Sequence, residues 1–181
     1  MLSRRLFLKY GLLGTTALAA GTITLGMQST RVTEPPEPLS CLSLEEYSIL
    51  VAIADCLLPS NPPFPPASEL RVAFHIDTLL TTVHSGNAAE IKLLLALIEN
   101  AASNMVFDRH WRPFTQSTNK QRYLLLDSWR TSQLSFRRTA FRALSGLCGA
   151  AYYAQPRAYQ LVGYNGPSKS LKTLVERAAQ H

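Results

Sequence analysis

The stretch SLEEYSILVAIADCLLP, residues 43–59, decides the fold. Ser43 followed three residues later by Glu46 is a capping box, in which each side chain accepts a hydrogen bond from the other residue's backbone N–H. Apolar residues then recur at helical spacing until Pro59 ends the pattern, and they are Tyr47, Leu50, Val51, Ala54, Leu57 and Leu58. The stretch therefore predicts an amphipathic helix with one face in a core.

The same signals predict further helices over about 66–83, 87–105, 118–129, 132–154 and 168–179. We expect the helix over 87–105 to be central, because Leu93 and Leu97 lie off its main apolar stripe and make it apolar over most of its girth. No segment alternates convincingly between apolar and polar residues. The sequence thus predicts an all-α fold, a single compact domain of about five to six helices after an N-terminal signal or anchor helix.

The charge distribution argues against nucleic acid as a partner. The 181 residues carry a net charge of +6, from 18 Lys and Arg against 12 Asp and Glu. Arg4, Arg5, Lys9 and Arg31 all precede the first acidic residue, Glu34, so the rest of the chain is nearly neutral. A near-neutral body lacks the basic surface that binds phosphates.

The N-terminus has the layout of an export signal. Six residues match the fixed positions of the pattern that it resembles, the bacterial twin-arginine leader: Ser3, Arg4, Arg5, Phe7, Leu8 and Lys9. The uncharged run Gly11–Met27 follows, and it is only mildly hydrophobic. The alternative is a plain membrane anchor that begins with two arginines. We expect a domain plan of a signal or anchor over 1–30, a Pro-rich linker over 31–41 and a helical domain over 42–181.

The fate of this leader is open. Ala17-Leu18-Ala19 offers a small-residue cleavage site, but it lies in the middle of the apolar run. A run of 17 residues is at the lower edge of what spans a bilayer. The protein is therefore expected in the periplasm, or on the inner membrane facing the periplasm if the leader is retained, with the twin-arginine translocase as a partner.

The cysteines and histidines form no recognisable chemical motif. Cys41, Cys56 and Cys148 contain no C-x-x-C pair, which argues against zinc and iron–sulfur sites. In an oxidising compartment two of them could pair in any combination, and the alternatives are no bond or a bond to another subunit. The four histidines are scattered and have no metal-ligand spacing, and they are His75, His84, His110 and His181. We expect no catalytic, metal or cofactor site in this chain.

Several stretches together resemble the gluconate 2-dehydrogenase subunit 3 family over about Leu42–Pro167. They are Leu42–Leu80, Arg122-Tyr123-Leu124, Trp129, Arg137–Leu144, Tyr152-Tyr153 and Gly163–Pro167. The resemblance implies a small non-catalytic subunit that accompanies a large FAD-containing dehydrogenase of the glucose-methanol-choline type, often with a cytochrome c subunit that carries haem c. In several such complexes only the small subunit has the twin-arginine leader, which implies that this chain binds its folded partner and takes it through the translocase.

Two other classes of function compete with this interpretation. One is a stand-alone, membrane-tethered periplasmic helical protein with a binding or structural task. The other is an enzyme in its own right, which would need its scattered cysteines and histidines to assemble a site in the fold.

Two segments are candidates for docking the partner. One is the loop Pro59–Pro66, whose prolines pre-order Phe64. The other is an aromatic segment with Tyr152, Tyr153, Tyr159 and Tyr164, because tyrosines are enriched in interface hot spots. The alternative is that Tyr152 and Tyr153 complete the core. Arginines on the helix over 132–154 pair with a partner's carboxylates or form a solvated basic face, and they are Arg137, Arg138 and Arg142.

Overall fold

The computed structural model describes residues 31–100 and 112–166, and every regular element in these ranges is helical. The elements are α2 (Leu44–Leu57), α3 (Val72–Leu80), α4 (Ser85–Glu99), the 3₁₀ helix η1 (Phe114–Gln116), α6 (Asn119–Arg130), α7 (Ser135–Tyr153), α8 (Pro156–Tyr159) and the 3₁₀ helix η2 (Gln160–Val162). This confirms the predicted all-α fold. The expected N-terminal helix, the helix over 168–179 and residues 101–105 of the third predicted helix lie outside the described residues.

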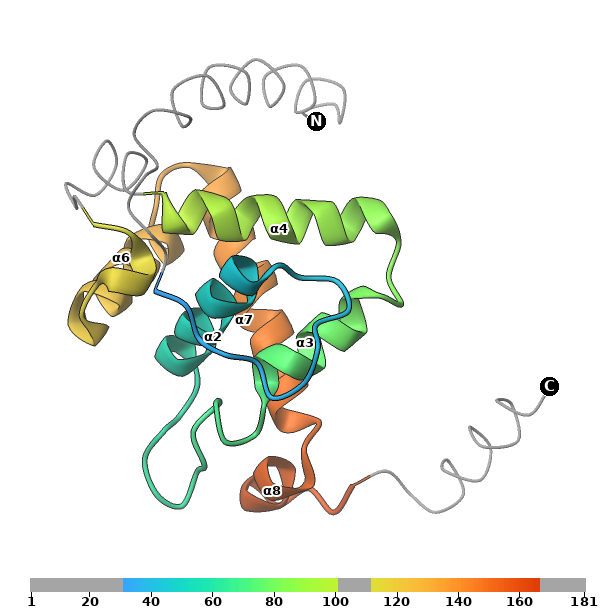
Figure 1. Cartoon of the computed structure of the whole chain (residues 1–181). Coiled ribbons are helices and arrows are strands. Elements are labelled where there is room, and N and C mark those ends of the chain that lie inside the picture. The colour runs from blue at the N-terminus through green and yellow to red at the C-terminus, as the bar shows by residue number, and fades with distance from the viewer. Residues whose placement is uncertain (1–30, 101–111, 167–181) are drawn as a thin grey trace, which may run out of the picture.

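Helix α2 lies at the centre of the fold. It packs against α3, α4, α6, α7 and η1 (Figure 1). Its predicted capping box is present, since the Ser43 hydroxyl accepts from the Glu46 N–H at 3.1 Å and the Glu46 carboxylate accepts from the Ser43 N–H at 2.8 Å. Leu50 and Ile53 are fully buried. The stretch that predicts the first helix therefore also supplies the middle of the core.

Helix α4 is not central, so that prediction is wrong. It runs along one edge of the domain (Figure 1), where α2 and η1 are its main neighbours. Its buried residues are Ala88, Leu95 and Ile98, whereas Leu93 is 56% exposed. An apolar surface around a helix is buried only where other elements cover it, and α4 is covered on one side.

Three helices begin at other residues than predicted. Helix α3 begins at Val72 rather than near residue 66, because Arg71 has a left-handed backbone (φ 50°) that a right-handed helix cannot include. Helix α4 begins at Ser85, two residues before the predicted start. His84 caps this end of the helix, because its ring accepts a hydrogen bond from the Gly86 N–H. Helix α7 begins at Ser135, three residues later than predicted. In contrast, Thr118 and Gln121 form a capping box, and α6 begins where it was predicted.

The linker is extended as expected, but it packs on the domain instead of hanging free. The N–H of Arg31 donates to the Thr115 hydroxyl at 3.1 Å, and the N–H of Thr33 donates to the Ser48 hydroxyl at 2.8 Å. Further along, the Glu37 carboxylate pairs with Arg71 at 3.2 Å. The linker is therefore bonded to α2, η1 and the turn before α3.

A buried carboxylate joins the end of this linker to α3. Asp77 is fully buried, and its oxygens accept hydrogen bonds from the backbone N–H groups of Ser40, Cys41 and Leu42 at 2.7, 3.0 and 2.7 Å. Hydrogen bonds to an ionised carboxylate are stronger than neutral ones and offset the cost of burying the charge. Asp77 thus fixes the backbone that leads into α2.

Helix α4 holds the same junction from another side. The Lys92 ammonium donates to the Cys41 carbonyl at 2.6 Å and pairs with the Glu46 carboxylate at 3.3 Å. Helix α3, through Asp77, and helix α4, through Lys92, therefore both fix the backbone at the start of α2. Among the described helices, none has the length and apolar character needed to cross a membrane.

Removal of the Asp77 carboxylate should destabilise the protein strongly. Asp77→Ala leaves three backbone donors without their acceptor, so we expect a loss of about 3 kcal/mol or more in the free energy of unfolding. Urea unfolding followed by circular dichroism measures this loss. Asp127→Ala is the matched control, because Asp127 makes an exposed ion pair with Arg130 and should cost about 1 kcal/mol or less. Equal losses in the two variants would contradict the role of Asp77.

Candidate partner-binding surface

The two segments predicted separately as docking candidates lie together in the fold. The Pro-rich loop between α2 and α3 and the α8–η2 segment line an open groove of about 510 Å³, with Phe64 and Leu161 on its two walls. Figure 1 shows this loop and α8 next to each other at one end of the molecule. An ion pair between Arg157 and Glu69 joins the walls. The structure therefore brings Phe64 together with residues that lie between the predicted tyrosines, namely Arg157, Gln160 and Leu161, whereas none of the four tyrosines lines this groove.

Tyr152 holds this surface together from below. Its side chain is fully buried, and its hydroxyl donates to the Pro65 carbonyl at 2.7 Å, which links α7 to the Pro-rich loop. Burial raises the pKa of this hydroxyl, so it remains a proton donor. This placement corresponds to the core alternative for Tyr152: it positions the loop instead of contacting a partner.

The other three tyrosines are more accessible. Tyr153 is 41% exposed and packs edge-on against Tyr152, with ring centroids 5.1 Å apart. Tyr164 is 52% exposed and packs edge-on against the half-buried Tyr159 at 5.4 Å. These rings present apolar area at low entropic cost, as interface anchors do.

A tight turn positions Tyr164 against Tyr159. Gly163 (φ 77°) and Gly166 (φ 86°) have left-handed backbones, which glycine adopts without strain. A Cβ on Gly166 would lie 2.9 Å from the Tyr159 hydroxyl oxygen, so only glycine fits here without a shift. The short helices before this turn were not predicted, and in the second of them Leu161 and Val162 are 41% and 54% exposed. Their exposure follows from the fold and has no signal in the local sequence.

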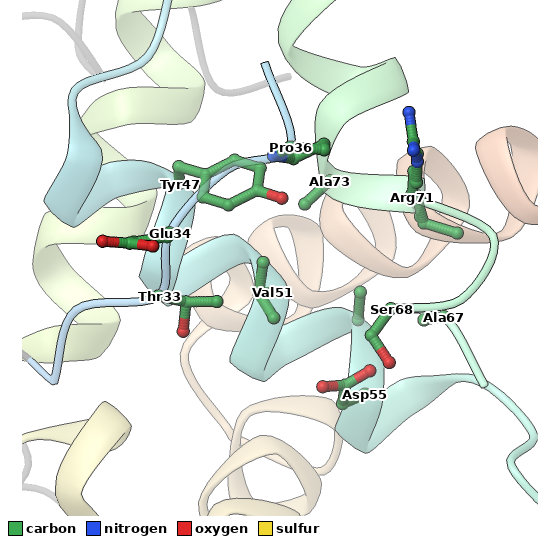
Figure 2. Close-up of a pocket in the computed structure, with 12 residues that line it drawn as sticks. Thr33, Glu34, Pro36, Tyr47, Val51, Asp55, Ala67, Ser68, Arg71 and Ala73 are labelled. Carbon is green, nitrogen blue, oxygen red and sulfur yellow. The ribbon is translucent and has the colours of Figure 1, made fainter. Parts of the chain in front are cut away.

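A smaller pocket of about 250 Å³ lies where the linker crosses α2 and the turn before α3 (Figure 2). Tyr47 lies at one end, and Asp55 and Ser68 lie beside each other at the other end. Burial raises the pKa values of the Tyr47 hydroxyl and the Asp55 carboxyl. The pocket therefore lies between the linker and the helical body and has polar groups at both ends. Among residues 31–100 and 112–166, no cluster of three or more His, Cys, Asp or Glu could hold a metal ion.

The three cysteines carry free thiols in the structure. Cys148 is fully buried, and burial raises its pKa to about 12, so it remains protonated and unreactive at neutral pH. Burial also raises the pKa of the half-buried Cys56. A disulfide that includes Cys41, Cys56 or Cys148 stays a prediction, as does the export signal, whose residues lie outside the described ranges.

The arginines of α7 do not form one basic face. Arg137 is buried, its guanidinium lies over the Trp129 ring at 4.9 Å, and it donates to the Ser128 hydroxyl. Arg138 donates to the Ser132 carbonyl. Of the three predicted arginines, only Arg142 is classed as exposed. A solvated position, one of the two alternatives for Arg137, is therefore wrong, because the Trp129 ring of α6 covers the guanidinium.

One comparison with known proteins gives a match. The family model described as gluconate 2-dehydrogenase subunit 3 matches residues 44–166, from the first residue of α2 through the Gly163–Gly166 turn. No curated protein and no solved structure matches the chain.

Loss of the Tyr152 hydroxyl should loosen the groove. Tyr152→Phe removes the donor to the Pro65 carbonyl, and we expect it to lower the free energy of unfolding by about 1 kcal/mol. It should also speed amide hydrogen exchange in the Pro-rich loop, as measured by mass spectrometry. The matched control is Tyr153→Phe, which alters the exposed neighbour and should change neither quantity. Unchanged exchange in both variants would show that the hydroxyl does not hold the loop.

Proposed function

Because the chain belongs to the gluconate 2-dehydrogenase subunit 3 family, we propose that it is the small, non-catalytic subunit of a periplasmic dehydrogenase complex. Its partner is a large FAD-dependent subunit of the glucose-methanol-choline type, and a cytochrome c subunit completes the complex. The observation that carries this proposal is the family match over residues 44–166, which includes every helix of the described domain. In this proposal FAD and haem c belong to the partner subunits.

The second part of the proposal concerns export. The chain carries its folded, FAD-loaded partner through the twin-arginine translocase, which reads the leader residues Ser3–Lys9. The twin-arginine route exports folded proteins, and this chain has no recognised cofactor motif. A partner that holds a cofactor explains why the chain carries such a leader. The complex then resides in the periplasm, or on the inner membrane if the leader is retained.

In this proposal the large subunit binds at the groove. Its lining combines the Pro-rich loop with Leu161, and Val162, which follows Leu161 in η2, is 54% exposed. Prolines lose little conformational freedom when a partner binds, which reduces the entropic cost of association. Tyr152 holds one wall in place from the core.

Affinity purification of the tagged chain from its native host tests the complex. We expect a leaderless flavoprotein to co-elute in near-stoichiometric amount, with a flavin absorbance spectrum. Leu161→Ser with Val162→Ser should weaken co-elution about tenfold or more, since a hot-spot contact is worth about 2 kcal/mol. The matched control is Leu93→Ser, which changes another exposed leucine, on α4. If the unaltered chain elutes alone and without flavin absorbance, the proposed function is overturned. If the groove variant and the Leu93 variant recover equal amounts of flavoprotein, the groove is excluded as the binding surface.

Substitution of the arginine pair tests the export role. Arg4→Lys with Arg5→Lys should block export of this chain and of the flavoprotein together, because lysine does not reproduce the bidentate hydrogen bonding of a guanidinium. Cell fractionation with immunoblotting of both proteins measures this. Arg31→Lys makes the same change outside the leader and should leave export intact. Persistent export of both proteins from the Arg4 and Arg5 variant would refute the twin-arginine assignment.

A further inference from the structure

Helix α6 presents two large apolar side chains to solvent. Tyr123 is 62% exposed and Leu124 is 57% exposed, the highest values among the large apolar side chains of the described residues. The opposite face of the helix packs into the core through Leu125, Leu126 and Trp129. Lys120 precedes Tyr123 by three residues and Leu124 by four, and therefore lies on the same face of the helix as these two side chains. We call Lys120, Tyr123 and Leu124 the outer face of α6.

The N-terminal segment leaves the domain beside this helix. The backbone N–H of Arg31 donates to the hydroxyl of Thr115, which lies in η1 just before α6. Arg122 of α6 in turn donates to the carbonyl oxygens of Phe114 and Thr115. Figure 1 shows the first described residues next to α6. Residue 31 is therefore fixed near the N-terminal end of α6.

Chain length limits the distance between the N-terminal end of α6 and the uncharged apolar run Gly11–Met27. The uncharged run ends at Met27, four residues before Arg31. Four residues of extended chain span at most about 14 Å. Because the linker is bonded to the domain from Arg31 onwards, it adds no further slack. A bilayer that holds the apolar run is therefore close to the start of α6.

The charge of this region fits an anionic surface. Between Arg112 and Arg130 the chain has four basic residues and one acidic residue, Asp127. Arg31 adds a further positive charge beside them, and the Glu99 carboxylate, which accepts hydrogen bonds from Thr115, adds one negative charge, so the region stays positive. Lysine and arginine near a membrane are attracted to anionic lipid headgroups, while a tyrosine next to a leucine suits the boundary between headgroups and acyl chains.

We propose that the outer face of α6 rests on the anionic headgroups of the bilayer in which Gly11–Met27 inserts. This inference rests on the proposed export role in the form in which the leader is retained and tethers the chain to that membrane. The groove lies at another end of the molecule, lined by the Pro-rich loop and α8 (Figure 1). The domain thus contacts lipid through α6 and the large subunit through the groove.

Site-specific photo-cross-linking tests this placement in the full chain. The photoreactive residue p-benzoylphenylalanine replaces Tyr123, and in a matched control it replaces Leu79, an exposed leucine of α3. Each protein is illuminated in vesicles of phosphatidylethanolamine and phosphatidylglycerol and analysed by mass spectrometry. We expect a phospholipid adduct at position 123 and none at position 79. Adducts at both positions or at neither would overturn the proposal.

Charge reversal and native membranes sharpen the test. Lys120→Glu should reduce the yield of the lipid adduct at position 123 about fivefold or more, since one basic residue at an anionic surface is worth about 1 kcal/mol. An unchanged yield would overturn the headgroup contact. In native-host membranes, an adduct of position 123 with a protein in place of lipid would assign α6 to a protein interface and overturn the proposal.

The two proposals fail in distinguishable ways. Affinity purification of the chain from the cross-linked native-host membranes reports whether the flavoprotein is bound. Co-elution of the flavoprotein without a lipid adduct at position 123 would overturn the membrane contact alone. A lipid adduct without any flavoprotein would support the membrane contact and overturn the subunit role.

Discussion

The carboxylate of Asp77 is the constraint on which the rest of the fold depends. It accepts three backbone hydrogen bonds from Ser40, Cys41 and Leu42, and thereby attaches the segment before α2 to α3. Lys92 attaches the same segment to α4. Since α2 packs against all the longer helices, the position of its first turn determines how those helices meet. A charge that is costly to bury is stabilised here because its hydrogen bonds are short and directed at both oxygens.

The two surfaces assigned to partners depend on this arrangement in different ways. The groove needs the Pro-rich loop to lie against α7, and one hydrogen bond from Tyr152 to Pro65 provides that contact. The outer face of α6 needs the linker to be fixed at η1, and the bond from Arg31 to Thr115 provides that contact. Both surfaces are therefore positioned by bonds between segments more than 80 residues apart.

The sequence predicted those features that depend on neighbouring residues. The capping boxes at Ser43 and Thr118 are formed by residues three apart, so they could be read directly. The exposure of Leu93 and the burial of Arg137 could not be predicted, because each depends on which element packs alongside. Of the candidate site, the Pro-rich loop with Phe64 was predictable from the sequence. Its meeting with Leu161 in one groove was not, since it requires the loop and the α8–η2 segment to meet in space.

The packed linker has a consequence for maturation by proteolysis. A protease binds its substrate as extended backbone whose N–H groups are free to bond with the enzyme. The N–H groups of Arg31 and Thr33 are already bonded to Thr115 and Ser48. In a chain that loses its leader, cleavage of the folded protein is thus favoured ahead of Arg31, and the linker stays bonded to η1 and α2.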